Sequence, residues 1–342
     1  MRKLAKSQRL YLYQFCSDMI HAELPLYDAL LKLQQQGGKL LGKSFSNKLK
    51  TLTDKMREST SISAVFEELI PRDELSVIHA AERSGSLADG FLTLVNVIRY
   101  NSELTQKLIS AVIFPIIMLV LALIVIAGYA VKVFPAFEEV VPIATWPSVT
   151  QALYHFGNAL IEGLWLKIVL VVTAAVFLIR FTMVNLTGYF RDRVLDKILP
   201  FSTYKQIGAS IFLNNMALML KNGIPINDAL EIIKLNSNRW LKHHIDSMLT
   251  KMSHGQNYGE ALNSGLFGHE ELLNINLYAG LPSFNQVLNS VSSRSRVKIQ
   301  EYIQKLSGLL KSLSTLVLGG CVIWVFISLF ALSDTISQMT SF

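Results

Sequence analysis

Residues 109–131 read ISAVIFPIIMLVLALIVIAGYAV, and their only ionisable group is the phenol of Tyr129. A helix needs about 20 apolar residues to cross the ~30 Å hydrocarbon core of a bilayer, so this run is long enough to span one. Pro115 and Gly128 are tolerated in membrane helices because neighbouring helices satisfy the freed backbone groups. We therefore predict a first transmembrane helix at 109–131, kinked at Pro115.

Two further apolar runs follow. Residues 313–332, LSTLVLGGCVIWVFISLFAL, carry no charge, whereas residues 164–184 contain Lys167 and Arg180 near their two ends. Both charged heads can reach opposite interfaces, so this run also predicts a span. Hydrophobic residues make up 51% of the 342-residue chain and charged residues only 17%. Charged residues are about 25% of a typical soluble domain, and the low share here agrees with a membrane protein.

The distribution of charge predicts the orientation of the chain. Residues 1–108 hold 15 Lys and Arg, residues 180–312 hold 15, and residues 133–164 hold none. Because short loops rich in Lys and Arg stay in the cytoplasm, the loop between the first two spans is expected outside. The N-terminus is then cytoplasmic and the C-terminus periplasmic. Basic cytoplasmic surfaces also gain roughly 1 kcal/mol per residue near anionic membrane lipid.

The chain contains an internal repeat at a spacing of 200 residues. The segment from Met19, MIHAELPLYDAL, aligns with the segment from Met219, MLKNGIPINDAL. Each copy reads as an amphipathic helix, a tight break and a second helix that starts near Pro25 or Pro225. Asp28 and Asp228 fall in the first turn of the second helix, where the helix dipole favours a carboxylate.

No alternating strand pattern of useful length occurs, so the predicted class is all-α. We predict an integral membrane protein with two repeated cytoplasmic helical-bundle domains and three transmembrane helices. The expected boundaries are cytoplasmic repeats at 1–108 and 185–312, spans at 109–131, 164–184 and 313–332, a periplasmic loop at 132–163 and a periplasmic tail at 333–342.

One stretch matches a phosphate-binding motif. Residues 37–44, GGKLLGKS, satisfy G-x-x-x-x-G-K-[ST]. That chemistry needs a strand before the loop and a parallel sheet to hold the Mg²⁺ ligands, but the preceding LYDALLKLQQQ reads as an amphipathic helix. We interpret the match as a chance one in a basic loop between helices.

Other candidate chemistry is equally weak. His243, His244, Asp246 and His254 are interpreted as a solvated helix face and not a metal site. No G-x-S-x-G or H-E-x-x-H pattern occurs, and no basic stripe with interleaved aromatics points to nucleic acid. The predicted spans carry no charge between their flanking Lys and Arg, which argues against an ion pathway. We expect no enzyme, catalytic residue, cofactor or metal.

The motif M-x-x-x-x-[LI]-P-[LI]-x-D-A-L twice, the turn at 81–87 (AERSGSL) and the early Pro115 carry a resemblance that covers nearly the whole chain. The chain resembles the inner-membrane platform proteins of type IV pili and type II secretion systems, the GspF/PilC type. Its turn has Ala81 where that family has glycine, the second copy at 279–283 lacks the glutamate, and Glu23 replaces a glycine that Gly223 keeps. These departures suggest the type IVb branch, of the toxin-coregulated or bundle-forming kind.

The resemblance implies a function without chemistry of its own. Such proteins lie in the bacterial inner membrane as homo-oligomers, engage a cytoplasmic assembly ATPase and move pilins into the growing fibre beside other inner-membrane assembly proteins. A transporter subunit, or a receptor or scaffold of another secretion system, remains the alternative. Partner or structural roles are predicted for seven residues: Pro25, Asp28, Glu82, Gly85, Pro115, Pro225 and Asp228.

Overall fold

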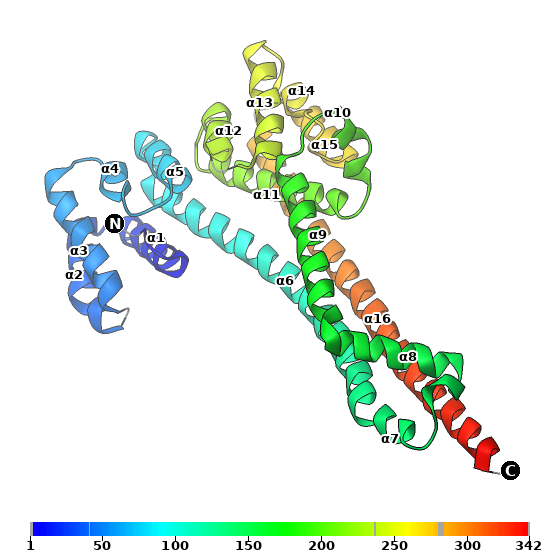
Figure 1. Ribbon diagram of the computed structural model, residues 1–342. Helices are drawn as coiled ribbons and strands as arrows, with labels where there is room; N and C mark the ends of the chain where they lie inside the picture. Colours follow the sequence, from blue (N-terminus) through cyan, green and yellow to red (C-terminus); the bar gives the residue numbers. More distant parts are fainter. Residues whose placement is uncertain (1–2, 41, 236, 280–283, 341–342) are drawn as a thin grey trace. The chain divides into compact units, whose positions relative to one another are not determined.

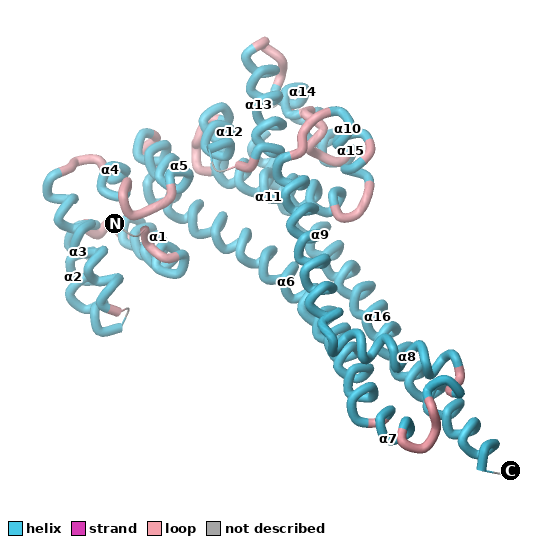
Figure 2. Tube along the Cα trace, viewed as in Figure 1, coloured by secondary structure: helices cyan, strands magenta, loops and turns pink. Residues whose placement is uncertain are grey.

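The computed structural model describes residues 3–40, 42–235, 237–279 and 284–340. Over these residues every regular element is helical and no β-strand occurs (Figures 1 and 2). The predicted all-α class is therefore confirmed. Three helical stretches are long and apolar enough to cross a membrane: Leu87–Glu138, Ser148–Asn185 and Phe284–Met339. Each contains one of the three predicted spans.

The chain divides into two compact units, and the boundary runs through its long helices. The first unit combines Met1–Leu104 with Thr182–Ile299, and the second combines Thr105–Phe181 with Gln300–Phe342. Within the first unit we call residues 3–104 the first lobe and residues 182–299 the second lobe. Each lobe contains one copy of the repeated motif.

The first lobe is built from α1 to α5 and the start of α6. Their bounds are α1 Lys6–His21, α2 Leu26–Leu40, α3 Lys43–Glu58, α4 Ile62–Phe66, α5 Arg72–Arg83 and α6 Leu87–Lys132. Its core holds the mutually packed rings of Tyr13, Phe66 and Phe91, all at most 1% exposed. The Tyr13 hydroxyl donates to Glu74 at 2.7 Å, and Glu74 pairs with Arg9 at 2.8 Å, so the polar groups that reach this core are satisfied.

The second lobe repeats this plan with different connections. Its helices, together with the membrane helices that flank it, are α9 Trp165–Asn185, α10 Tyr189–Arg193, α11 Phe201–Lys221, α12 Ile226–Leu235, α13 Arg239–Ser253, α14 Tyr258–Leu262, α15 His269–Tyr278 and α16 Phe284–Thr340. The short α14 corresponds to α4, and α15 corresponds to α5.

The second unit corrects one expectation. Residues 132–163 were expected to be a loop, but they contain α7 Phe134–Glu138, a 3₁₀ turn at Ile143–Thr145 and α8 Ser148–Ala159. An aromatic cluster of Phe134, Trp146 and Tyr154 gives this segment a core of its own.

Helix α8 is seated on two neighbours. The Thr150 hydroxyl donates to the carbonyl of Ser328 in α16 at 2.9 Å. On α6, a Cβ atom added at Gly157 would lie 2.5 Å from the Ala130 Cβ atom, closer than any real contact. Only glycine therefore allows this approach of the two helices.

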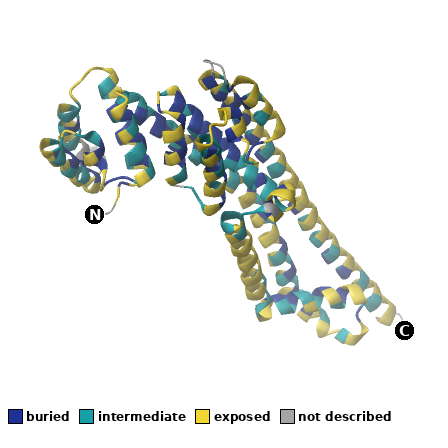
Figure 3. Ribbon diagram, turned by 90° about the horizontal axis from the view of Figure 1, so that it is seen from above, coloured by how far each residue is buried: buried dark blue, intermediate teal, exposed yellow. Residues whose placement is uncertain are grey.

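The apolar surface of the second unit faces outward. Large side chains such as Leu170, Phe177 and Phe330 are 69%, 69% and 79% exposed, and Figure 3 shows long exposed faces on these helices. In water such a surface would be unstable, whereas lipid is its natural environment. Lys167 and Arg180 lie near the two ends of α9 and are also exposed, as the snorkelling interpretation requires.

Candidate functional site

The repeated motif forms the same backbone in both lobes. In each, the helix ends in a Schellman turn: Leu24 N–H donates to the Met19 carbonyl at 3.0 Å, and Ile224 N–H donates to the Met219 carbonyl at 3.0 Å. The left-handed position of the turn is held by Glu23 (φ 56°) in the first lobe and by Gly223 (φ 77°) in the second.

The motif prolines and aspartates lie where the sequence predicted them. Pro25 and Pro225 directly precede α2 and α12, and Asp28 and Asp228 occupy the first turns of these helices. All four are exposed at the surface of the first unit. They start helices, and whether a partner touches them remains a prediction.

Glu82 joins the end of α5 to the start of α4 through hydrogen bonds. Near the end of α5, its carboxylate accepts hydrogen bonds from the backbone N–H groups of Ile62 (2.5 Å) and Ser63 (3.1 Å). It also accepts from the hydroxyls of Ser61 (3.0 Å) and Ser63 (2.7 Å). Partial burial raises the pKa of Glu82, but the hydrogen bonds from Ser63, Ile62 and Ser61 outweigh burial and hold that pKa below its ordinary value. The carboxylate thus caps the N-terminus of the five-residue α4.

Gly85 makes the turn that follows. Its φ of 71° is left-handed, and the turn closes with Ser86 N–H donating to the Ala81 carbonyl at 2.9 Å and Gly85 N–H donating to the Glu82 carbonyl at 3.2 Å. This is again a Schellman turn, which requires a residue free of Cβ strain at this position. It directs the chain from α5 into α6.

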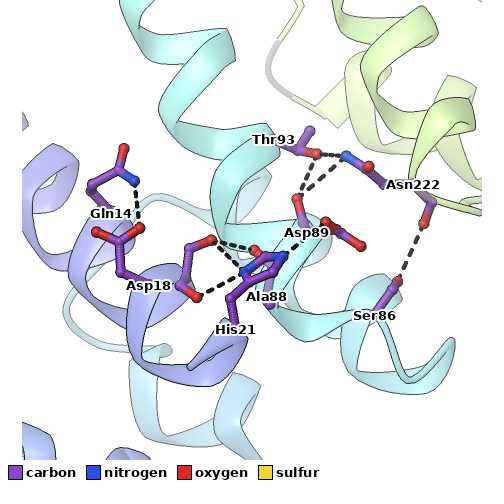
Figure 4. A network of polar contacts seen from close by, with 9 residues as sticks. Gln14, Asp18, His21, Ser86, Ala88, Asp89, Thr93 and Asn222 are labelled. Atoms are coloured by element: carbon purple, nitrogen blue, oxygen red, sulfur yellow. Dashed lines mark hydrogen bonds and ion pairs between the residues drawn. The ribbon is translucent and has the colours of Figure 1, made fainter. Parts of the chain in front are cut away.

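The same turn joins the two lobes (Figure 4). The Ser86 hydroxyl donates to the Asn222 carbonyl at 3.2 Å, and the Asn222 side chain donates to the Asp89 carbonyl at 3.3 Å and to the Thr93 hydroxyl. Farther along α6, the hydroxyls of Tyr100 and Ser210 are hydrogen bonded at 2.7 Å. The lobe contact therefore uses polar groups on one side of α6 and on α11.

Two grooves lie beside the predicted residues. A groove of about 590 Å³ separates α4 and α5 from α12, and its lining includes His79, Arg83, Asp228 and Glu231. A second, of about 500 Å³, lies between α1 and α2, and its lining includes Pro25 and Asp28 with the apolar side chains of Tyr11, Phe15, Met19, Leu24 and Leu33. Pro225 lines a smaller groove of about 210 Å³ with Tyr258 and Phe284.

Pro115 is buried within the second unit, apart from these grooves. Helix α6 continues through it as one α-helix from Leu87 to Lys132. The seven predicted residues thus do not form one site. Six of them lie in the first unit, at helix starts and at the α5–α6 turn.

Arg191 is a buried cation that no sequence pattern indicated. The Arg191 side chain is fully buried, donates to the carbonyls of Met183 (2.7 Å) and Leu186 (2.5 Å), and pairs with Asp196 at 3.3 Å. Its guanidinium lies 4.6 Å from the ring centroid of Trp240. Burial lowers the pKa of Arg191, and Asp196 opposes that shift. The guanidinium caps the end of α9 where it enters the second lobe.

His244 corrects the expectation of a solvated histidine face. It is 1% exposed, packs edge-on against Trp240, and its Nδ1 lies 2.9 Å from the Ser264 carbonyl oxygen. Burial lowers the pKa of His244, so its neutral form is favoured. Among the described residues, no group of three or more His, Cys, Asp and Glu side chains converges.

The phosphate-loop match has the wrong surroundings. Helix α2 runs to Leu40 and α3 begins at Lys43, so helices flank the match on both sides, and Leu41 lies outside the described residues. A phosphate loop needs a strand in front. The equivalent of the Glu82 turn in the second lobe, at 280–283, also lies outside the described residues.

These features define a membrane-anchored, two-lobed helical protein whose surfaces suit docking. The sequence profile described as "Type II secretion system (T2SS), protein F" matches residues 12–135 and 212–332, one match for each copy of the repeat. The chain belongs to this family. It is an inner-membrane platform protein of type IV pilus and type II secretion machinery, as the resemblance implied.

Named relatives are similar over most of their length. The chain is 37% identical to the toxin coregulated pilus biosynthesis protein E of Vibrio cholerae over 99% of both chains. It is 25% identical to the type IV pilus assembly protein PilC of Myxococcus xanthus, over 93% of this chain and 78% of the relative. It is 22% identical to PilC of Thermus thermophilus, over 93% and 81%. The suggested similarity to the toxin-coregulated branch is confirmed.

Proposed function

We propose that this protein couples a cytoplasmic assembly ATPase to the insertion of pilins into a growing type IV fibre, as a homo-oligomer beside other inner-membrane assembly proteins. The observation that carries the proposal is the lobe contact, in which two copies of one helical fold are hydrogen bonded through Asn222 to the α5–α6 turn. A joined pair of lobes with open grooves offers surfaces on which partners can dock.

The proposed orientation places both lobes in the cytoplasm and the C-terminus in the periplasm. The distribution of charged residues supports this orientation, since residues 133–164 contain no Lys or Arg and three acidic residues. In this orientation, the lobes meet the ATPase and the lipid headgroups, and α8 with its aromatic cluster lies on the periplasmic side. The proposed role needs no catalytic residue, cofactor or nucleic acid.

The test is recovery of partners with the tagged full-length chain, extracted in mild detergent from native membranes. We expect a secretion-type ATPase and pilins in the eluate, and loss of pili in the deletion strain. Normal piliation after deletion, with neither partner recovered, would refute the proposal. Reaction of single cysteines at positions 139 and 242 with an impermeant maleimide tests the orientation, because only the periplasmic position should react in intact cells.

A further inference from the structure

The contact between the two lobes is head-to-tail. The first lobe contributes one edge, α5 and the start of α6, and the second lobe contributes a different face, α11 and α12. Ala80 of α5 and Ile232 of α12 line the same groove, and the Tyr100–Ser210 hydrogen bond joins α6 to α11. Ile232, on the α12 side of this contact, is 7% exposed.

Because the lobes are repeats, each side of this contact has a counterpart elsewhere in the first unit, and both counterparts carry exposed apolar side chains among the described residues. The face of α11 and α12 corresponds to that of α1 and α2, with Met19 matching Met219. The edge of α5 and α6 corresponds to that of α15 and α16, with Leu87 matching Phe284. Burial supports this alignment, as two matched core pairs show: Ile78 and Ile275, both 0% exposed, and Phe91 and Leu288, 0% and 1% exposed.

The corresponding face on the first lobe is an apolar groove. Leu24 is 51% exposed, whereas its counterpart Ile224 is 2% exposed and lies beside Tyr258 and Phe284 of its own lobe. Tyr11 is 44% exposed beside it, and both line the 500 Å³ groove between α1 and α2. Among the described residues, the lining of this groove comes only from α1, α2 and the turn between them.

The corresponding edge on the second lobe is more apolar than its counterpart. Leu273 and Leu277 of α15 are 57% and 65% exposed, and they match Ser76 and Ala80, which line the lobe contact. Val297 of α16, 57% exposed, matches Tyr100. Adjacent exposed side chains of this size on one helix edge indicate an interaction surface.

We propose that the α15–α16 edge of one chain docks on the α1–α2 groove of a second copy, repeating between chains the contact that joins the lobes within a chain. The occupant is a second copy because, among the described residues, the α11–α12 face that corresponds to this groove meets the α5–α6 edge, and the α15–α16 edge is the repeat of that edge. In this arrangement Val297 faces Leu10, where the chain itself places Tyr100 against Ser210, so an apolar pair replaces the polar one.

This contact is heterologous, since each chain offers an edge at one end and a groove at the other. Heterologous contacts generate rings when the rotation closes and open arrays when it does not. The inference deepens the self-assembly included in the proposed function, on which it rests, by assigning the surfaces that assemble. It makes no use of the ATPase or of pilins.

The test is cross-linking between two differently tagged full-length chains in membranes. Both chains carry Cys321→Ala, while Cys16 is fully buried and stays. One chain carries Lys32→Cys, at the position that matches Ile232, and the other carries Leu277→Cys, at the position that matches Ala80. With a short bismaleimide, we expect a product containing both tags when the chains are co-expressed, and none when either variant is expressed alone.

His243→Cys, exposed on α13, replaces Leu277→Cys as the matched control and should give no mixed product. A product from Leu277→Cys alone would overturn the proposal, because it would mean a two-fold contact. Oligomers without the mixed product would overturn the proposed surfaces and leave the platform function standing. Monomers alone would overturn the self-assembly as well.

A second variant tests the apolar edge directly. Leu277→Glu places a charge in the proposed contact and should shift the purified chain from oligomer to monomer, with the helical circular dichroism of the parent. An unchanged oligomer mass would overturn the proposal. In all cases recovery of the ATPase is measured separately, so loss of assembly and loss of the platform role are distinguished.

Discussion

Replacing Glu82 by alanine tests whether this residue stabilises the fold or contacts a partner. The substitution removes the acceptor for two backbone N–H groups and two hydroxyls at the start of α4. Hydrogen bonds to a charged group are worth about 1.5–3 kcal/mol each, but the four share one partly exposed carboxylate and do not add. We expect a loss of about 2–3 kcal/mol in the free energy of unfolding.

For a folded unit of roughly 200 residues, this loss corresponds to a fall in Tm of about 4–12 °C. The assay is thermal unfolding of the full chain in mild detergent. Glu67→Ala is the matched control, because this exposed carboxylate follows α4 directly, and its loss should stay within about 0.5 kcal/mol. Pilus assembly is scored in parallel at a temperature where both variants are folded.

The pH dependence gives a second measure. Because the pKa of Glu82 is lowered in the folded state, its contribution is complete above the unfolded pKa of about 4.3 and is lost as the pH falls through the folded value. The Tm difference between the parent and Glu82→Ala should therefore be full at neutral pH and shrink in acid. An unchanged Tm together with lost pilus assembly would refute the stabilising role of Glu82 and show that it contacts a partner.

Three further substitutions test other parts of the structure. Arg191→Leu should cost about 3–5 kcal/mol, because it leaves Asp196 buried without its main counter-charge, and a loss below about 1 kcal/mol by thermal unfolding would contradict this. Glu23→Gly should raise the free energy of unfolding by about 1 kcal/mol. The left-handed backbone costs a residue with a Cβ about 1–2 kcal/mol, and the greater entropy of glycine in the unfolded chain offsets part of this gain. A lower Tm would contradict the prediction. Gly157→Leu should dislodge α8 from α6, since even a Cβ would strike Ala130; unchanged hydrogen exchange in α8 would count against the seating.

Local signals in the sequence were reliable. The three apolar runs lie in the three candidate spans, because lipid imposes length and composition on a helix with little help from tertiary contacts. The motif around Pro25 and Pro225 predicted helix starts that the structure confirms, since proline acts through its fixed backbone angle and a first-turn aspartate through its carboxylate at the same helix end. The fold class followed from these two features.

Contacts between distant segments were not predictable. Asn222 carries no pattern that points to Ser86 or Thr93, because an amide side chain at the end of a helix is like that of any other polar residue there. His244 was expected in solvent, but Trp240 and Ser264 bury it through contacts set by tertiary packing. Residues 132–163 were expected to be a loop because they lie between two predicted spans, and the contacts of their aromatic side chains are set by tertiary packing. The motif residues lie at helix starts and at the α5–α6 turn, and their relations in space required the structure.

The burial of Arg191 separates two moments in the life of this chain. During insertion, the segment after α9 is still unfolded, and a cation there helps to decide which end of the helix is retained on the basic side. In the folded protein the same guanidinium is fully buried against Trp240 and the end of α9, out of reach of lipid headgroups. A charge that counts toward the proposed orientation in the nascent chain thus forms an internal ion pair with Asp196 once the second lobe has folded. Removing it would perturb biogenesis and stability through different events.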